Sequence, residues 1–342
     1  MKKQAASIPT PAAPLLLLAA LLVLLVFAGC ALEPEAGEDF PLPEPPPPAP
    51  EPGEVRTGLL YYPDAEWRFL VPLHREIPET ETIVRHTLEK LRDTSQLRQE
   101  LDTLGLVPLL PGDADILGIN IDASGLARVD FSGAFLQYDP SRERHVLGGL
   151  LCTLRQFPEI ERLEIMIDGA SPEKFPGGTP GRMPLGPECL INPEVDDALE
   201  DYRHYTAVKV YFCFMTPHRR ILYVPVTRIL PPSDDAASAA VKELLAGPRR
   251  GSGLFSDIPP DTVLRSLQLE DGLVVIDLSK DLLDYEGGRT GAENVVNQIL
   301  LTLAQLEGVN EIQILVEGEK VSLPEEIDLT VPLKPPAVYN FF

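Results

Sequence analysis

The sequence is poor in the residues on which nucleic-acid binding depends. Its 342 residues include 29 Lys and Arg against 52 Asp and Glu, a formal net charge of −23. Because a phosphate backbone is bound through Lys and Arg, we expect no nucleic-acid partner. The acidic excess identifies no other partner, since an ordinary solvated surface also produces it.

Cysteine is scarce as well, with four in the chain. None is spaced as C-x-x-C, so the sequence predicts neither a structural zinc site nor a thioredoxin-like redox pair. We expect Cys152, Cys189 and Cys213 to be small buried hydrophobic residues rather than disulfide partners. No metal site is expected.

The known short signatures of catalysis are missing too. The sequence contains no H-E-x-x-H, G-x-S-x-G, Walker loop or G-x-G-x-x-G. The glycine-rich segment Phe175–Arg182 is not followed by a strand-to-helix pattern, which favours a surface loop over an anion site. The chain is therefore predicted not to be an enzyme, with no catalytic residue, no cofactor and no small-molecule ligand.

The N-terminus has the pattern of an export signal. Two lysines precede an apolar run, Leu15–Phe27, which is shorter than the about 20 residues of a membrane span. Phe27-Ala28-Gly29-Cys30 resembles the lipobox of bacterial lipoproteins, with Phe27 where leucine is usual. The resemblance implies that residues 1–29 are a signal peptide and that Cys30 carries a diacylglycerol. An uncleaved anchor with an incidental cysteine is the alternative, and either places the rest of the chain outside the cytoplasmic membrane.

A tether is predicted over residues 30–55. Its part from Glu33 to Glu54 consists almost entirely of Pro, Glu, Ala and Gly. Such a composition cannot bury a core and favours extended polyproline II. The tether would hold the folded part away from the lipid surface.

The remainder is one module written twice. The stretch Leu110–Tyr138 aligns with Ile258–Tyr285, and eight positions are identical once one extra residue is allowed in the first turn. Each stretch alternates as a β-hairpin, closed by Asp122–Gly125 in the first copy and by Asp271–Gly272 in the second. A length difference inside a turn leaves the side-chain faces of the strands unchanged, as expected of a structural repeat.

Each module is predicted to be β-β-α-β-β-α-β, in the ranges 56–192 and 207–342 with a linker at 193–206. Thr80 and Ser233 are the expected N-caps of the first helices. The helices carry one apolar stripe and the strands alternate, so we expect two tandem two-layer α/β sandwiches with helices on one sheet face. The internal proline of the second strand, in Val71-Pro72 and Val224-Pro225, places that strand at an edge or a bulge.

Four charged residues recur at matched positions and are the candidate site residues. Asp130 and Asp277 face away from the core side of their strand, and each begins an Asp-x-Ser sequence that favours capping of the following turn. Arg75 and Arg228 are expected to be structural ion-pair partners, with those aspartates as candidate partners. A catalytic role for the aspartates and a binding role for the arginines are the alternatives.

These features together resemble the GerM domain family, the sporulation and spore germination domain of Gram-positive spore formers. The resemblance implies a lipoprotein on the extracytoplasmic face of the cell membrane that supports sporulation and germination by helping to assemble a transenvelope complex. It also implies modules similar to ring-building motifs. The residues that carry the match are Val224–Arg228, Leu244–Pro248, Ile258–Pro259, Asp271–Gly272, Val275–Ser279 and Ile314–Gly318.

The leading hypothesis is a non-enzymatic scaffold, anchored in membrane lipid through Cys30, that binds protein partners in a sporulation envelope complex. Two other classes stay open. A peptidoglycan-acting envelope enzyme would use the acids Asp130 and Asp277. A solute-binding lipoprotein would hold its ligand between the two modules.

Overall fold

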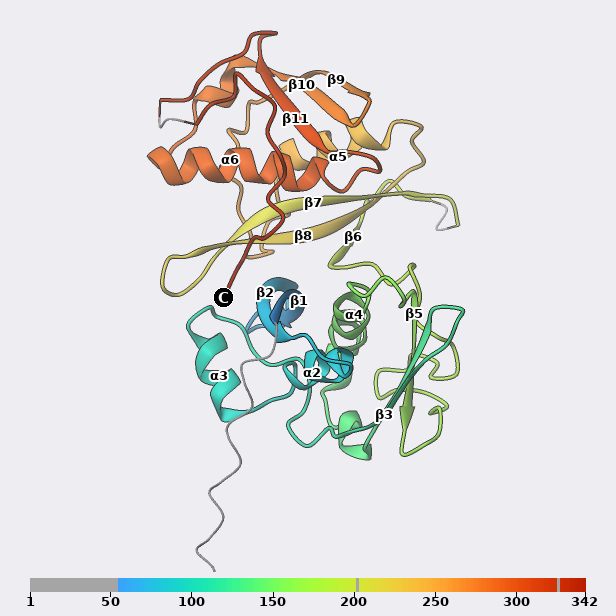
Figure 1. The fold of residues 1–342 in the computed structure, drawn as a ribbon. Coiled ribbons are helices and arrows are strands. Elements are labelled where there is room, and N and C mark those ends of the chain that lie inside the picture. The colour runs from blue at the N-terminus through green and yellow to red at the C-terminus, as the bar shows by residue number, and fades with distance from the viewer. Residues whose placement is uncertain (1–54, 201–202, 325–326) are drawn as a thin grey trace, which may run out of the picture. The chain divides into compact units, whose positions relative to one another are not determined.

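The computed structural model describes residues 55–200, 203–324 and 327–342 (Figure 1). Cys30, the predicted signal peptide and most of the predicted tether lie outside the described residues. The first module contains β1 (Val55–Pro63), β2 (Leu70–Pro78), α2 (Ile83–Glu89), α3 (Ser95–Asp102), β3 (Ile116–Ile121), β4 (Leu126–Phe131), the short 3-10 turns Gly133–Leu136 and Pro140–Arg142, α4 (Glu143–Leu154) and β5 (Arg162–Ile167).

The second module repeats this order without a counterpart of α3. A short strand, β6 (Pro193–Val195), precedes it and lies within the segment predicted as a linker. The module contains β7 (Thr206–Met215), β8 (Ile221–Leu230), α5 (Ala236–Leu245), β9 (Leu264–Glu270), β10 (Leu273–Leu278), the 3-10 turn Lys280–Leu283, α6 (Gly288–Leu303) and β11 (Glu311–Val316).

The strands of each module divide into a hairpin and a three-stranded sheet. The first module pairs β1 with β2 and orders the other strands β3-β4-β5, while the second pairs β7 with β8 and orders β11-β10-β9. In the second module α5 and α6 lie between the β7–β8 hairpin and the three-stranded sheet (Figure 1). The α/β fold in two tandem copies is thus confirmed, and in the second module the helices have strands on both sides.

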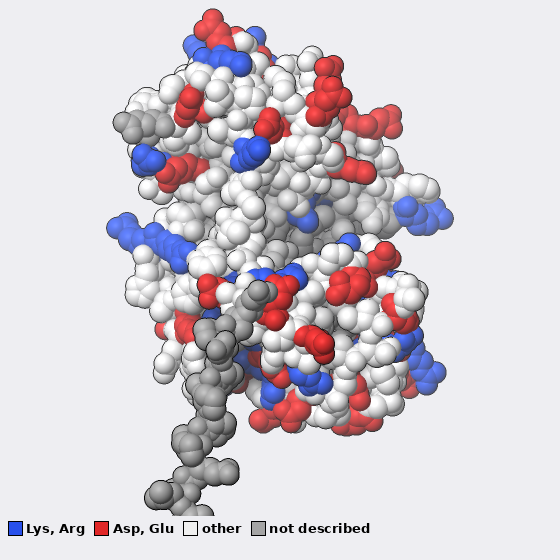
Figure 2. Space-filling model, in the orientation of Figure 1, with Lys and Arg blue, Asp and Glu red and all other residues white. Residues whose placement is uncertain are grey.

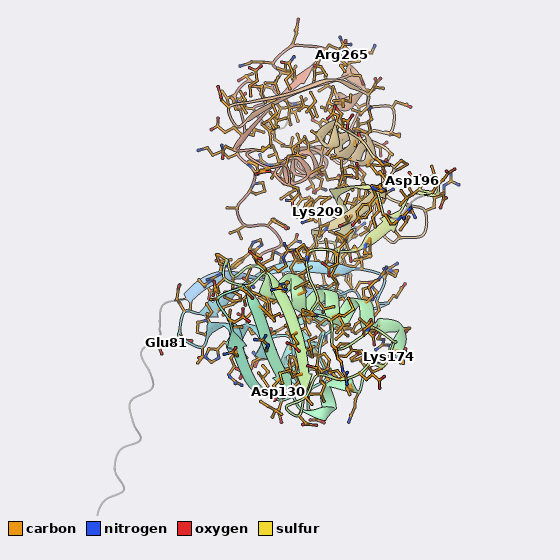
Figure 3. All side chains as sticks on the ribbon, turned by 90° about the vertical axis from the view of Figure 1, so that its right-hand side faces the viewer. Glu81, Asp130, Lys174, Asp196, Lys209 and Arg265 are labelled. Atoms are coloured by element: carbon orange, nitrogen blue, oxygen red, sulfur yellow. The ribbon has the colours of Figure 1, made fainter. Side chains whose placement is uncertain are left out.

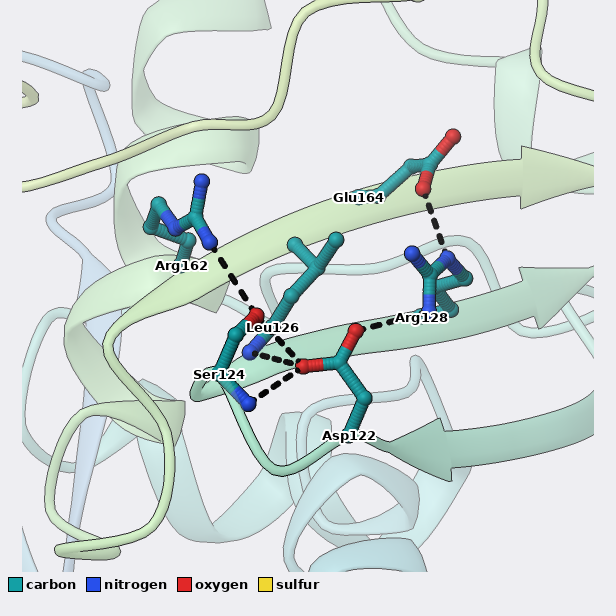
Figure 4. A network of polar contacts seen from close by, with 6 residues as sticks. All are labelled: Asp122, Ser124, Leu126, Arg128, Arg162 and Glu164. Atoms are coloured by element: carbon teal, nitrogen blue, oxygen red, sulfur yellow. Dashed lines mark hydrogen bonds and ion pairs between the residues drawn. The ribbon is translucent and has the colours of Figure 1, made fainter.

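The hairpin turns follow the sequence signal. Asp271 and Gly272 both adopt positive φ, 50° and 82°, as a two-residue hairpin turn requires. The longer first-module turn is held by Asp122, whose carboxylate accepts the N–H of Ser124 at 2.8 Å and the Ser124 hydroxyl at 2.6 Å (Figure 4). Arg128 joins Asp122 to Glu164 on β5 (Figure 4). The hydrogen bonds from Ser124, followed by those from the Leu126 N–H and the Arg128 side chain, lower the pKa of Asp122.

The N-cap residues of the first helices lie two residues later than expected. Ile83 and Ala236 are the first helical residues, so Thr82 and Asp235 occupy the N-cap positions in place of Thr80 and Ser233. Asp235 accepts the Ser238 N–H at 2.9 Å. The Asp235 carboxylate thus satisfies one of the free N–H groups that open α5, whereas the Thr82 side chain makes no capping hydrogen bond in α2.

The core forms where the apolar stripes predicted it. On α4 and just after it, the buried positions recur at three- and four-residue spacing and face the strands. Cys213 is buried, Cys152 and Cys189 are half-buried, and all three are free thiols. None of the described helices combines the length and the apolar character needed to cross a membrane. The buried stripe of the first module is Leu147, Leu150, Leu151, Leu154 and Phe157.

A buried hydroxyl joins each long helix to its hairpin. Thr153 on α4 accepts the Tyr61 N–H at 3.2 Å, and Thr302 on α6 accepts the Tyr211 N–H at 3.1 Å. Tyr61 and Tyr211 each lie opposite the proline of the paired strand. The N–H of each tyrosine points out of the ladder, and the threonine satisfies it.

Replacing Thr302 with Val should lower the free energy of unfolding by about 1–3 kcal/mol, because the buried Tyr211 N–H loses its acceptor while the side-chain volume is kept. Thr290→Val makes the same change at an exposed position of α6, where the effect should stay within about 0.5 kcal/mol. Urea unfolding measures both. Equal stability of Thr302→Val and the wild type would show that this bond contributes nothing.

Candidate functional site

The four matched charged residues do not converge on one site. Arg75 pairs with Glu100 on α3 and also reaches the Tyr62 hydroxyl at 3.4 Å. Arg228 lies 2.9 Å from a carboxylate oxygen of Glu194. The arginines therefore pair with glutamates, and the predicted pairing of Arg75 and Arg228 with the aspartates is wrong.

The two aspartates instead cap a turn on the neighbouring strand. Asp130 accepts the Gly169 N–H at 2.9 Å, just after β5, and lies in the three-stranded sheet of the first module (Figure 3). Asp277 accepts the Gly318 N–H at 2.8 Å, just after β11, and pairs with Arg265 at 3.1 Å. The capped turn follows the parallel partner strand, not the aspartate's own strand as predicted.

The serine of each Asp-x-Ser sequence fastens the loop that precedes the hairpin. Ser132 accepts the Asp115 N–H at 3.0 Å, and Ser279 accepts the Val263 N–H at 3.0 Å. The aspartate and the serine of each Asp-x-Ser sequence thus each accept a hydrogen bond from a backbone N–H. The arrangement is structural, because the aspartates lie in different sheets and share no acid–base partner.

The glycine-rich loop binds a carboxylate of its own chain. Glu143, at the start of α4 and 4% exposed, accepts the N–H groups of Gly177 and Thr179. The Tyr138 hydroxyl donates to the same side chain at 3.2 Å, and burial followed by the charge of Glu143 raises the pKa of Tyr138. The loop's donors are occupied from within, in keeping with a structural loop.

A contact between the modules emerges at the two prolines. Residues 55–342 belong to one compact unit, in which β2 packs against β8. Pro72 and Pro225 lie at the facing edges, since β6 pairs with β8 only over Thr227–Ile229. A proline has no N–H to extend a ladder, so the two edges meet without continuous pairing.

Asn192 bridges the two edges from the end of the first module. Its amide oxygen accepts the Leu70 N–H at 2.7 Å, and its Nδ2 donates to the carbonyls of Leu70 and Pro225 at 2.8 and 2.7 Å. Its φ is 44°, a conformation that Asn tolerates better than most residues. One side chain thus satisfies three backbone groups drawn from both modules.

Asn340 makes the reciprocal bridge from the end of the second module. Its amide oxygen accepts the Tyr223 N–H at 2.8 Å, and its Nδ2 donates to the carbonyls of Tyr223 and Pro72, both at 2.8 Å. Its φ is 49°. We call the contact of β2 with β8, closed by Asn192 and Asn340, the seam.

Each tail then runs beside a strand of the other module. After Asn192, β6 lies parallel to β8, and Thr227 donates its hydroxyl to the Ile191 carbonyl at 2.7 Å. After Asn340, Phe341 makes a parallel bridge to His74, whose Nδ1 lies 2.5 Å from the Tyr339 carbonyl. His74 therefore takes the place of Thr227 in the first module.

Apolar side chains fill the rest of the seam. Phe214, Leu222 and Val224 of the second module belong to the same buried cluster as the core of the first. Phe69 and Phe214 meet edge to face with centroids 5.3 Å apart. The modules therefore share buried surface, as in a stable interface.

Two histidines are buried in the first module. His74 makes the hydrogen bond described above, while the ring of His145 meets the edge of Trp67 with centroids 6.1 Å apart. Burial lowers the pKa of His74, and the bond to Tyr339 offsets part of that effect. Burial also lowers the pKa of His145, and the charge of Arg144 lowers it further.

The seam residues were present in the sequence but were not singled out. Asn192 and Asn340 end the two copies at matched positions, and that recurrence was the available signal. It went unused because an asparagine in a polar tail has no fixed role until its carbonyl partners are placed. Within the described residues no group of His, Cys, Asp and Glu could hold a metal ion.

Comparison with known proteins agrees with this architecture. The profile of the Germane family, described as sporulation and spore germination, matches residues 59–173 and 209–322. The chain belongs to this family. Spore germination protein GerM of Bacillus subtilis (strain 168) is 29% identical over 270 residues, which cover 77% of this chain and 73% of that protein.

The solved structure of the tandem GerMN domains of the sporulation protein GerM from Bacillus subtilis superposes with a TM-score of 0.70. It is 27% identical and covers 83% of this chain and 99% of that one. The predicted resemblance is confirmed: this is a GerM-like protein with two tandem GerMN domains.

Replacing Asn340 with Gly should lower the free energy of unfolding by about 2–4 kcal/mol, because one buried and two part-buried hydrogen bonds are lost while glycine keeps the positive φ. Asp271→Gly is the matched control, since Asp271 also has positive φ but is exposed in a turn. Urea unfolding should show little change for the control. A stable Asn340→Gly protein would argue that apolar packing alone holds the seam.

Stability should fall as the solution becomes acidic. Both histidines have folded pKa values below the ordinary 6.5, so protons prefer the unfolded chain. Their contribution is fully present above about pH 6.5 and is lost as the pH falls from there through the lowered folded values.

The test replaces each histidine with its counterpart in the second module, giving His74→Thr and His145→Asn. Thermal unfolding followed between mildly alkaline and mildly acidic buffers should show a shallower loss of stability for the double variant than for the wild type. Identical pH profiles would remove the two histidines from the explanation.

Proposed function

We propose that this protein is a lipid-anchored extracytoplasmic scaffold that supports sporulation and spore germination by assembling a transenvelope complex. Its family and its tandem GerMN architecture support a role in sporulation and spore germination. The observation that carries the scaffold role is the seam, in which each module's tail bridges to the other through Asn192 and Asn340. Two modules joined this way present partner surfaces in a fixed relation.

The outer surface suits a protein partner rather than a nucleic acid. On the face drawn in Figure 2, acidic and basic side chains are interspersed rather than gathered in one patch of a single sign. Interspersed charge favours specific pairing with a complementary surface over general attraction to a polyanion. The excess of Asp and Glu over Lys and Arg acts in the same direction.

The geometry gives less support to an envelope hydrolase. A glycosidase of the common kind needs two carboxyl groups that flank one bond, about 5–10 Å apart. Asp130 and Asp277 belong to separate sheets, and each accepts a backbone N–H. The scaffold therefore accounts for the recurrence of these aspartates better, since a capped turn is needed in both modules.

A solute held between the modules also finds little support. The hollow beside the seam, lined in part by Phe69, Asn192 and Val226, has a volume of about 190 Å³. Binding sites for small molecules usually measure about 300–1,000 Å³. Phe214, Leu222 and Val224 of the second module are buried in the same apolar cluster as the core of the first.

Membrane attachment through Cys30 is part of the proposal and rests on the lipobox-like sequence Phe27–Cys30. Diacylglycerol on that cysteine would hold the protein at the membrane surface. The Pro- and Glu-rich segment that follows would then act as a spacer.

Deleting the gene in the source organism should reduce the yield of heat-resistant, germinating spores and leave vegetative growth unchanged, because the proposed complex forms during sporulation. Restoring the wild-type gene should recover the yield. Cys30→Ala should shift the protein from the membrane fraction to the soluble fraction and recover less. Normal sporulation and germination in the deletion strain would contradict the proposal.

A further inference from the structure

One hollow is lined by residues of the first module alone. It measures about 360 Å³ and lies between the end of β2, the end of α2 and the helix α3. Its volume falls in the range of ligand sites. The residues that line it are Arg75, Pro78, His86, Glu89, Lys90, Arg92, Thr94, Gln96, Leu97 and Glu100.

The helix α3 builds this pocket and has no counterpart in the second module. Thr94 caps α3 by accepting the Leu97 N–H at 3.1 Å. Glu100, near the other end of α3, reaches Arg75 on β2. In the second module the chain turns at Gly247 instead, and the Gly247 carbonyl accepts a bond from Arg228 at 2.9 Å.

The two modules differ in charge around the matched arginines. Arg228 has two carboxylates, Glu194 at 2.9 Å and Glu243 at 3.5 Å. The positions that correspond to these glutamates by the repeat are Phe342 and Lys90. The Phe342 ring stacks against Arg75 at 5.7 Å, and Lys90 reverses the charge of Glu243.

The pocket therefore contains a cation without a counterion. Arg75 is paired with Glu100, and Arg92 bonds to Asp115 at 2.8 Å. The Lys90 ammonium, half-buried at the pocket wall, forms no ion pair or hydrogen bond with any described residue. Burial and the nearby charge of Arg75 lower the pKa of Lys90, and the charges of Glu100 and Glu76 offset only part of that effect. An added negative charge would therefore stabilise this ammonium further.

We propose that this pocket binds a carboxylate of an acidic protein segment, with Lys90 as the residue that receives it. The equivalent position of the second module holds the carboxylate of Glu243, which pairs with Arg228, whereas the first module presents an ammonium there. Gln96 and Thr94 offer further donors at the wall. This deepens the proposed scaffold role, on which the choice of a protein segment as the ligand rests.

The lining favours a carboxylate in a peptide over a phosphate. Glu89 and Glu100 also face the pocket, and they repel a dianion more strongly than a monoanion. Their oxygens accept N–H groups, which a peptide backbone supplies and a phosphate lacks. In this lining Lys90 would pair with one acidic side chain, and the glutamates would accept from the peptide N–H groups beside it.

The test measures binding of N-acetylated, C-amidated pentaglutamate to the full chain in detergent by calorimetry, with pentaglutamine and inorganic phosphate as the other probes. Saturable binding of pentaglutamate below about 10 mM is expected. Lys90→Gln should weaken it by about tenfold, the loss of one charge-assisted hydrogen bond. Lys90→Glu, which copies the second module, should abolish it.

The control variant is Lys242→Gln, an exposed lysine on α5, and it should bind like the wild type. Thermal unfolding confirms that each variant is folded. The proposal is overturned by the absence of saturable binding, by equal binding of pentaglutamine, by phosphate binding as tightly as the peptide, or by an unchanged Lys90→Gln. These results are independent of the deletion phenotype, so failure of the pocket and failure of the scaffold are distinguishable.

Discussion

The pair of edges that cannot join is the constraint on which the rest of the structure depends. Pro72 and Pro225 remove the N–H that would extend β-pairing from one hairpin to the other. Their carbonyls still need donors, and the amides of Asn340 and Asn192 provide them. An edge that would invite uncontrolled strand addition becomes a defined joint between two modules.

The joint also explains why the tails and the matched arginines belong to one system. After Asn192 the chain forms β6 and brings Glu194 to Arg228. After Asn340 the chain brings Phe342, whose side chain carries no carboxylate, to Arg75. The helix α3 supplies Glu100 in its place. The difference between the tails, Glu194 in one and Phe342 in the other, therefore accompanies the extra helix α3 and the pocket beside it.

Much of the fold could be predicted from the sequence because its determinants are local. Alternation, turn residues and the apolar stripe of α4 depend on neighbours within a few residues, and they gave the element order and the core. The partner of Asp277 could not be predicted, because Gly318 becomes adjacent only when β10 and β11 pair in parallel. The amide of Asn340 reaches Pro72 across 268 residues, which no local pattern reports. The helix caps were missed by two residues because several oxygen-bearing side chains precede each helix.

Comparison of the two copies separates structure from function more sharply than either copy alone. The aspartates that both modules keep, Asp130 and Asp277, accept from a backbone group that each copy of the fold must satisfy. At the equivalent positions of Lys90 and Glu243 the two modules differ, so the fold itself accepts either residue. A requirement other than folding therefore selects the residue at this position. Glu243 forms an ion pair with Arg228 within the second module, whereas Lys90 lines the pocket of the first module without an ion-pair partner among the described residues. Burial and the charge of Arg75 disfavour the Lys90 ammonium, and a carboxylate from a partner would offset that cost, which is why specificity for a partner is expected at the asymmetric pocket rather than at the repeated hairpin.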